Sequence, residues 1–96
     1  MTTLDAVRQH RSEILELARK HGAANVRIFG SVVRGDDEPD SDIDLLVDAL
    51  GPTSAWFPAG LILDLEELLA RRIDVVTERG LNPFIRDQVL DEAQPV

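Results

Sequence analysis

The segment Val26–Asp48 reads VRIFGSVVRGDDEPDSDIDLLVD and contains the two features on which the predicted fold and chemistry depend. An apolar run ends at Gly30-Ser31, and ten residues later Asp42-Ile43-Asp44 opens a second apolar run. Residues i and i+2 of a strand point to the same face, so Asp42 and Asp44 are predicted to stand side by side, roughly 6–7 Å apart along the backbone. Two such carboxylates repel each other unless a cation lies between them. The pattern therefore predicts a divalent-metal site.

Gly30 and Ser31 offer the complementary groups. A strand that ends at Gly30 lets the backbone approach a ligand closely, and Ser31 suits the N-cap of a short helix that ends near Gly35. The free N–H groups at a helix start favour phosphate. One strand end thus offers donors to a phosphate, and the next strand offers carboxylates to Mg²⁺. A nucleoside triphosphate needs both.

The spacing of these residues, Gly30-Ser31 followed after ten residues by Asp42-x-Asp44, resembles the G-S-x10-D-x-D pattern of the DNA polymerase β-like nucleotidyltransferase superfamily. The longer text GSVVRGDDEPDSDIDLLV resembles the minimal nucleotidyltransferases (MNT), small proteins often paired with a HEPN-domain toxin. The resemblance implies an α/β (α+β) fold with a small mixed three-stranded sheet backed by helices. Strict alternation of helices and strands would instead favour a parallel sheet. The expected strand directions therefore rest on the resemblance.

Helices and strands are predicted to alternate along the chain in the order α-β-α-β-α-β-α, and residues 1–96 are predicted to form a single domain. Thr2 or Thr3 is expected to cap the first helix, Gly22 to end it, and Asn82-Pro83 to start the last one. The predicted elements are a helix at 3–20, a strand at 25–29, a short helix ending near 35, a strand at 42–47, a helix at 58–71, a strand at 72–77 and a helix at 82–92.

Two loops carry polar or aromatic side chains whose roles are open. Residues 36–41 are predicted to form a solvated acidic loop. The loop at 49–58 contains Trp56-Phe57. We expect this pair to pack onto the core, and the alternative is a base-stacking or partner-binding role.

Asp74 lies in the middle of the predicted strand in the segment RRIDVVT, thirty residues after Asp44. An aspartate in an Ile/Val strand is unfavourable by propensity, so it needs an explanation. One explanation is a salt bridge to Arg71, Arg72 or Arg79. The other is that this strand lies beside the preceding one and carries a third carboxylate to the same metal ions, as the resemblance implies.

The resemblance also assigns roles. It implies two Mg²⁺ ions, which Mn²⁺ could replace, in the arrangement for in-line displacement at phosphorus. Gly30 and Ser31 are expected to orient the β- and γ-phosphates of ATP. Arg34 either reaches the triphosphate or pairs with Asp36 or Asp37. The implied catalytic residues and metal ligands are Asp42, Asp44 and Asp74.

Composition narrows the choice of partner. The formal net charge is −8, with Asp+Glu 18 against Lys+Arg 10, and such a charge opposes capture of DNA or RNA. We therefore expect no direct nucleic-acid substrate. Cysteine is absent, which excludes thiolate metal sites and thiol nucleophiles and is compatible with the cytoplasm. No apolar run is long enough to predict a membrane span.

Larger relatives in the superfamily carry a further domain that binds the acceptor, and this sequence is not expected to form one. The acceptor is therefore expected to be bound by a second protein, or to be that protein. The resemblance implies transfer of AMP from ATP to a tyrosine hydroxyl of a HEPN-type RNase toxin, within a hetero-oligomer. The chain would then be the antitoxin of a type VII-like toxin–antitoxin pair. The alternatives are a non-catalytic antitoxin that neutralises its partner by binding, and the catalytic subunit of a small-molecule nucleotidyltransferase.

Overall fold

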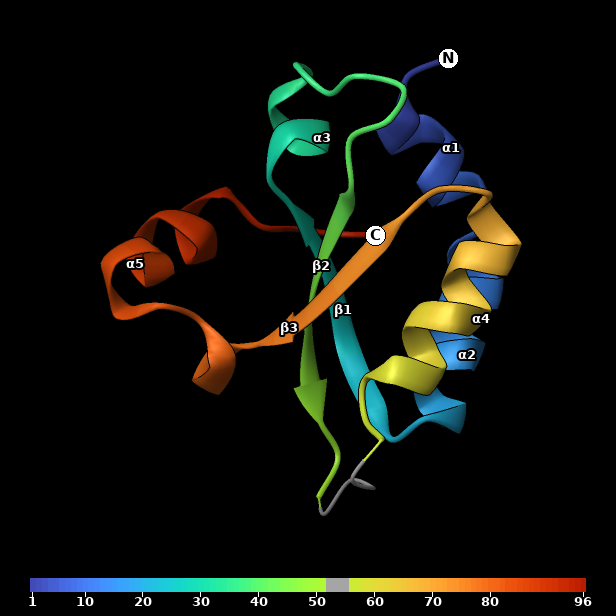
Figure 1. Cartoon of the computed structure of the whole chain (residues 1–96), viewed down its shortest axis with the longest axis vertical. Helices are drawn as coiled ribbons and strands as arrows, with labels where there is room; N and C mark the ends of the chain where they lie inside the picture. The colour runs from blue at the N-terminus through green and yellow to red at the C-terminus, as the bar shows by residue number, and fades with distance from the viewer. Residues whose placement is uncertain (52–55) are drawn as a thin grey trace.

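A mixed four-stranded sheet in the order β3-β2-β1-β4 forms the middle of the molecule (Figure 1). The computed structural model describes residues 1–51 and 56–96, so part of the loop at 49–58 lies outside the described residues. β1 runs antiparallel to β2 and β4, whereas β2 and β3 are parallel. The strands are β1 (Ala23–Phe29), β2 (Ile43–Ala49), β3 (Ile73–Thr77) and β4 (Gln94–Pro95).

The predicted mixed sheet is confirmed, but the predicted number of strands was too low by one. β4 has two residues, which pair with Arg27 and Ile28 of β1. A strand this short shows no alternation of apolar and polar residues, and one of its residues is a proline, which is depleted in strands. The local sequence therefore gave no reason to expect it.

Five α-helices and one 3₁₀ turn occur in the described part of the chain. The predicted helix at 3–20 is wrong as a single element, because it breaks at His10, whose φ and ψ are −98° and 17°. The first half packs beside α3, whereas the second packs on β1 and α4, so the break lets each half follow its own neighbours. The helices are α1 (Thr3–Gln9), α2 (Arg11–Lys20), α3 (Ser31–Arg34), α4 (Ala59–Leu69) and α5 (Pro83–Glu92), with the 3₁₀ turn at Glu78–Gly80.

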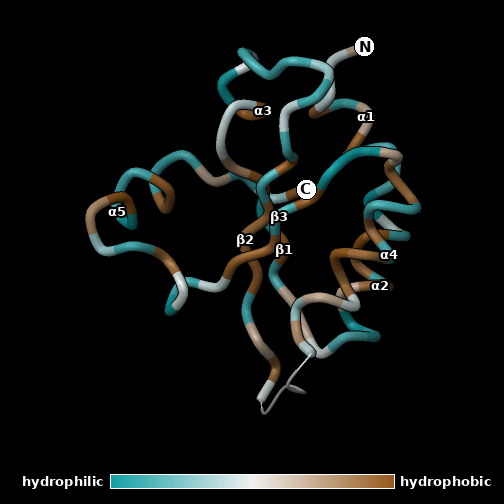
Figure 2. The backbone as a smooth tube through the Cα atoms, in the orientation of Figure 1, coloured by the Kyte–Doolittle hydropathy of each residue, from teal (hydrophilic) through white to brown (hydrophobic). Residues whose placement is uncertain are grey.

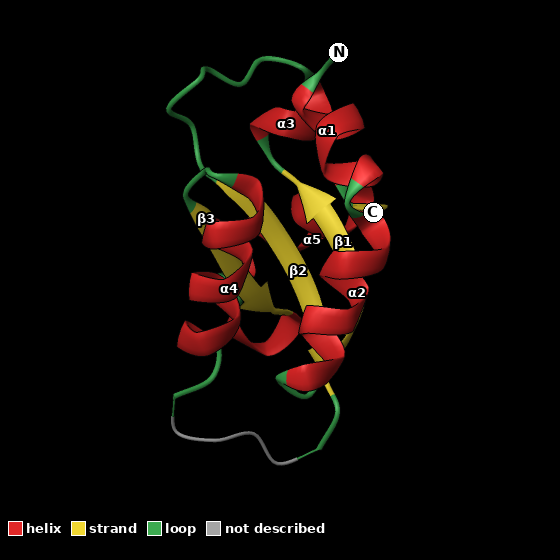
Figure 3. Cartoon of the chain, turned by 90° about the vertical axis from the view of Figure 1, so that its right-hand side faces the viewer, coloured by secondary structure: helices red, strands yellow, loops and turns green. Residues whose placement is uncertain are grey.

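The main core lies between one face of the sheet and helices α2 and α4 (Figure 3). The alternation predicted for β2 is confirmed, since Ile43, Leu45 and Val47 are all buried in this core. Figure 2 shows hydrophobic colouring along much of β2 and α4, whereas hydrophobic and hydrophilic residues alternate along α2. The residues that are at most 1% exposed here include Val7, Ile14, Ala18, Ile28, Leu61 and Leu65.

Helix α5 lies on the opposite side of the sheet (Figure 1). Leu46, Leu81 and Val89 form a second, smaller buried cluster beneath it. Leu46 breaks the alternation of β2 because α5 covers this part of the face that also carries Asp44. The predicted start of α5 is confirmed, since the side chain of Asn82 caps it by accepting from the N–H of Phe84 at 2.9 Å.

The structure corrects the predictions around residues 56–71. Trp56 is 80% exposed, so the expected packing of Trp56 onto the core is wrong, whereas Phe57 does pack against the core. Pro58 is the N-cap of α4 and not a first-turn residue, and the helix ends at Leu69 because Ala70 adopts a left-handed conformation, with φ 54°. In the described ranges, no helix has the length and apolar character required to cross a lipid bilayer.

Candidate active site

The turn between β1 and α3 is built around Gly30. Gly30 is the N-cap of α3, with φ 83° and ψ −154°, and Ser31 is the first helical residue, so the prediction of Ser31 as N-cap is wrong by one position. The positive φ explains the shift, because glycine adopts this conformation at little cost. A Cβ atom at position 30 would also collide with the carboxylate of Asp44. The chain therefore requires glycine here for its backbone conformation and for its closeness to Asp44.

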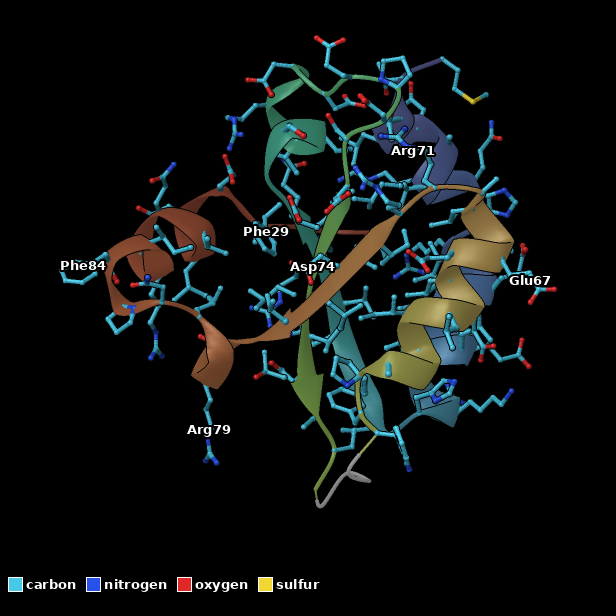
Figure 4. The ribbon with its side chains drawn as sticks, in the orientation of Figure 1. Phe29, Glu67, Arg71, Asp74, Arg79 and Phe84 are labelled. Atoms are coloured by element: carbon cyan, nitrogen blue, oxygen red, sulfur yellow. The ribbon has the colours of Figure 1, made fainter. Side chains whose placement is uncertain are left out.

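The parallel pairing of β2 with β3 brings two predicted site residues together. Asp44 pairs in register with Asp74, and on its other side Asp44 pairs with Phe29 of β1. Figure 4 labels both Phe29 and Asp74. Residues in register on adjacent strands point to the same face, and neighbouring strands lie about 4.8 Å apart. Asp42 is exposed and precedes β2 by one residue, two positions before Asp44. The three carboxylates therefore cluster where β2 and β3 begin.

This placement perturbs Asp44. Burial, followed by the charges of Asp74 and then Asp42, raises the pKa of Asp44 from 3.8 to about 6, although the charge of Arg34 opposes the shift. A bound cation would favour the ionised form of a carboxyl group that lies next to two other carboxylates. Carboxylate oxygens are also the donors that Mg²⁺ prefers. The donor set thus fits a divalent cation.

The carboxylates are not already arranged around an ion. Among the described residues, no group of three or more His, Cys, Asp or Glu side chains has the geometry to hold a metal ion. Instead, Oδ1 of Asp42 lies 3.1 Å from Nε of Arg72. Metal binding would therefore use the other oxygen of Asp42 or require Asp42 to release this arginine.

The structure removes one of the two explanations for Asp74. Within the residues that the structure describes, Asp74 forms no salt bridge with Arg71, Arg72 or Arg79, and the first two of these arginines contact other residues. Arg71 lies 3.7 Å from Asp37, and Arg72 pairs with Asp42. Asp74 is exposed, so its carboxylate is free to meet a ligand.

Arg71 and Arg72 anchor the acidic loop that leads to Asp42. Arg71 Nη2 donates to the carbonyl oxygens of Glu38 at 3.2 Å and Ser41 at 2.7 Å, and Arg72 Nη2 donates to that of Asp40 at 2.9 Å. The prediction of a fully solvated loop at 36–41 therefore needs correction. Asp37 is its clearest exception, because the side chain is 13% exposed and accepts from Thr3 Oγ1 at 2.7 Å.

Arg34 and Gly30 share a partner that the sequence did not predict. Glu92, the last residue of α5, accepts from the N–H of Gly30 through Oε2 at 2.9 Å and from Arg34 Nη1 through Oε1 at 2.7 Å. Arg34 also lies 3.6 Å from Asp36, one of its two expected protein partners. Glu92 is 62 residues from Gly30, and no local pattern links the two. Only the packing of α5 on the sheet brings them together.

The chain is similar to known proteins over most of its length. Residues 7–96 match the nucleotidyltransferase domain family. A protein adenylyltransferase, MntA, of Thermococcus cleftensis is 39% identical over 77 residues, which are 80% of this chain and 78% of that protein.

Solved structures agree on the fold. A structure provisionally described as a minimal nucleotidyltransferase is 47% identical, with a TM-score of 0.85, over 100% of this chain and 97% of that one. The complex of a tri-AMPylated Shewanella oneidensis HEPN toxin with an MNT antitoxin matches with a TM-score of 0.67 at 21% identity, over 92% of this chain and 69% of that one. At that identity the second match speaks for the fold alone.

Proposed function

The chain belongs to the nucleotidyltransferase domain family, and we propose that it is an antitoxin that transfers AMP from ATP to a tyrosine hydroxyl of a HEPN-type toxin. The observation that carries the proposal is the in-register pairing of Asp44 with Asp74 beside the Gly30 turn. The name of the Thermococcus relative, a protein adenylyltransferase, supports a protein as the acceptor. The Shewanella complex, which has the same fold, is an example of an antitoxin bound to an AMPylated HEPN toxin. The active form would be a hetero-oligomer with the toxin. Because the reaction consumes ATP, we place it in the cytoplasm.

In this proposal the three carboxylates hold two Mg²⁺ ions, or Mn²⁺ in their place. Bound there, the ions would neutralise the triphosphate and lower the pKa of the attacking hydroxyl. The residues proposed as metal ligands are Asp42, Asp44 and Asp74.

The remaining steps fall to the side chains and backbone of the protein. The N–H of Gly30, together with Ser31 and Arg34, orients the β- and γ-phosphates. The tyrosine oxygen attacks the α-phosphorus, the bond between the α-phosphorus and the bridging oxygen breaks, and pyrophosphate leaves with those electrons. Asp74, which is exposed, accepts the hydroxyl proton in the role of a general base. The products are an adenylated tyrosine and pyrophosphate.

A second candidate, neutralisation by binding without catalysis, is favoured by one observation. Arg72 pairs with Asp42, and Glu92 pairs with Gly30 and Arg34, so protein side chains already satisfy much of the proposed site. A site that no longer binds metal ions or nucleotide would show the same contacts between protein groups. The third candidate is the catalytic subunit of a small-molecule nucleotidyltransferase. It differs from the first only in the molecule that receives the AMP.

Position-specific labelling of ATP separates these functions. The chain is incubated with its HEPN-type partner, Mg²⁺ and ATP labelled either at the α- or at the γ-phosphorus. The proposal predicts that the α-label enters the partner and that the γ-label is released as pyrophosphate. Transfer of the γ-label to the partner would contradict nucleotidyl transfer. If the partner stays unlabelled while its RNase activity is suppressed, the non-catalytic candidate is favoured.

A further inference from the structure

The C-terminal end of α5 places a carboxylate on the groups proposed to bind phosphate. Glu92 is the last residue of this helix, its side chain is 15% exposed, and one oxygen of its carboxylate contacts each donor. The donors are the N–H of Gly30 and the guanidinium of Arg34. We propose that Glu92 is a built-in competitor of the nucleotide, a carboxylate that the triphosphate must displace before it can bind. This inference rests on the proposed function.

The backbone of Glu92 is fixed on both sides, so the side chain remains within reach of its partners. On one side, Val89 of α5 is buried in the cluster with Leu46 and Leu81. On the other, Gln94 pairs with Ile28, the last but one residue of β1. A competitor tethered in this way acts at a high effective concentration, which a free ligand has to overcome.

Electrostatics favour displacement of the Glu92 carboxylate by the triphosphate over binding of both at the same place. A triphosphate carries several negative charges, and Glu92 already acts on Asp44 as a like charge. The single N–H of Gly30 forms one well-aligned hydrogen bond, so a phosphate oxygen and Oε2 of Glu92 compete for it. When Glu92 leaves, one negative charge leaves the site and Arg34 becomes available to the phosphates. The contact therefore lowers the affinity for nucleotide, and it keeps Arg34 and Gly30 satisfied until nucleotide arrives.

The alternative is that Glu92 serves only as a structural link between α5 and the β1–α3 turn. Both readings predict that loss of the carboxylate destabilises the ligand-free protein, because two hydrogen bonds to a charged acceptor are weakened. They differ in what happens to ligand affinity. A competitor predicts tighter binding when its charge is removed, whereas a structural link predicts unchanged or weaker binding.

The test compares Glu92→Gln with Asp91→Asn by titration calorimetry, using inorganic tripolyphosphate and Mg²⁺-ATP as probes. Glutamine keeps an oxygen for the N–H of Gly30 but loses the charge that holds Arg34. Asp91 is the matched control, because it carries the same charge on the same helix, is exposed, and forms no salt bridge within the described residues. We expect Glu92→Gln to bind both probes roughly three- to thirty-fold more tightly, the difference between a charged and a neutral hydrogen bond. The control should stay within about two-fold, the size expected of an exposed charge.

The Tm of the ligand-free protein is a second readout. The Tm of Glu92→Gln should be lower than that of the wild type, although this variant binds the probes more tightly. Unchanged or weaker binding by Glu92→Gln overturns the competitor, and the proposed function survives if the wild type still binds ATP and transfers its AMP. If neither the wild type nor any variant binds either probe, both the competitor proposal and the proposed function are overturned.

A second measurement uses the wild type, so it does not depend on a variant that folds. During titration with tripolyphosphate, the carboxyl ¹³C resonance of Glu92 and the amide resonance of Gly30 should shift together. Ligand binding that leaves the Glu92 resonance unmoved also overturns the proposal.

Discussion

The carboxylate of Asp44 occupies the space that a side chain at position 30 would need. Because Asp44 also pairs in register with Asp74, the β1–α3 turn and the aspartates of β2 and β3 form one packed unit. The glycine of the motif is thus required by its neighbour on β2 as well as by its own backbone angles. This relationship leads to a test of how tightly the turn and the carboxylates depend on each other.

Gly30→Ala should be more destabilising than Gly35→Ala. Both glycines have a positive φ, 83° and 79°, but nothing lies within 4 Å of a Cβ atom at position 35. Gly35, with ψ 15°, lies in the left-handed helical region, which costs an alanine about 1–2 kcal/mol. Gly30, with ψ −154°, lies in a region that essentially only glycine adopts. Gly30→Ala must also turn Asp44 aside, so we expect it to lose about 1–3 kcal/mol more stability than Gly35→Ala. Urea unfolding of the two variants measures the difference, and equal losses would contradict a special requirement for glycine at position 30.

Asp44→Asn should stabilise the ligand-free protein near neutral pH. The pKa of Asp44 is about 6 in the folded state and 3.8 in the reference state, so the folded form binds more protons between these values. Stability of the wild type therefore falls as the pH rises from about 4 to 6 and stays lower above 6. Asn lacks this penalty. Because Asp44 is only half-buried, we expect a gain on the order of 1 kcal/mol above pH 6, after allowance for solvent screening, and almost none near pH 4.

Thermal melts across this pH range measure the effect, with Asp87→Asn as the control on the exposed surface of α5. A gain that is the same at pH 4 and pH 8 would rule out the unfavourable ionisation of Asp44 as its cause.

Mg²⁺ with ATP should raise the Tm of the wild type. A ligand that binds only the folded state at about 100 times its Kd stabilises it by about 2.7 kcal/mol. Asp42→Asn combined with Asp44→Asn should abolish this shift and leave the fold intact. ATP with a chelator in place of Mg²⁺ serves as the control. A wild-type Tm that does not move at millimolar ATP and Mg²⁺ would count against the proposed metal site.

Arg71→Ala should loosen the acidic loop that precedes Asp42. The side chain is 20% exposed and donates to two carbonyl oxygens of the loop, so its loss leaves the backbone of residues 36–41 without these anchors. We expect the free energy of unfolding to fall by about 1–3 kcal/mol, as for other buried hydrogen bonds to a charged group. We also expect faster hydrogen exchange in the loop. Arg86→Ala is the control, because Arg86 is half-exposed and lies 3.8 Å from its only salt-bridge partner among the described residues, Glu78. If exchange in the loop is the same in both variants, Arg71 is not what orders it.

The sequence predicted the parts of the molecule that local pattern determines. Alternation along β2, the cap and proline at the start of α5, and the spacing from Gly30 to Asp44 all follow from residues close in the chain. The family resemblance is confirmed by the match over residues 7–96 and by the relative 39% identical to this chain. The roles proposed for the individual site residues stay predictions.

The features that sequence reasoning missed depend on contacts between distant segments. The helix break at His10 reflects the different neighbours of α1 and α2. The strand β4 forms only because its two residues meet β1, and Glu92 reaches Gly30 only because α5 packs on the sheet. None of these pairings leaves a periodic signal within one segment. Even the expectation that the strand of Asp74 lies beside the strand of Asp44 came from the resemblance, and neither strand alone predicted their register.

The central claim is that Asp74 acts in catalysis and not in partner binding, and one measurement tests it most directly. Wild type and Asp74→Asn are each combined with the HEPN-type partner, Mg²⁺ and ATP. Complex formation is checked by gel filtration, and the partner is then weighed by intact mass spectrometry. The account predicts that both chains form the complex and that only the wild type leaves added adenylate on the partner. A partner that carries the same adenylate after incubation with Asp74→Asn, or none after incubation with the wild type, would contradict it.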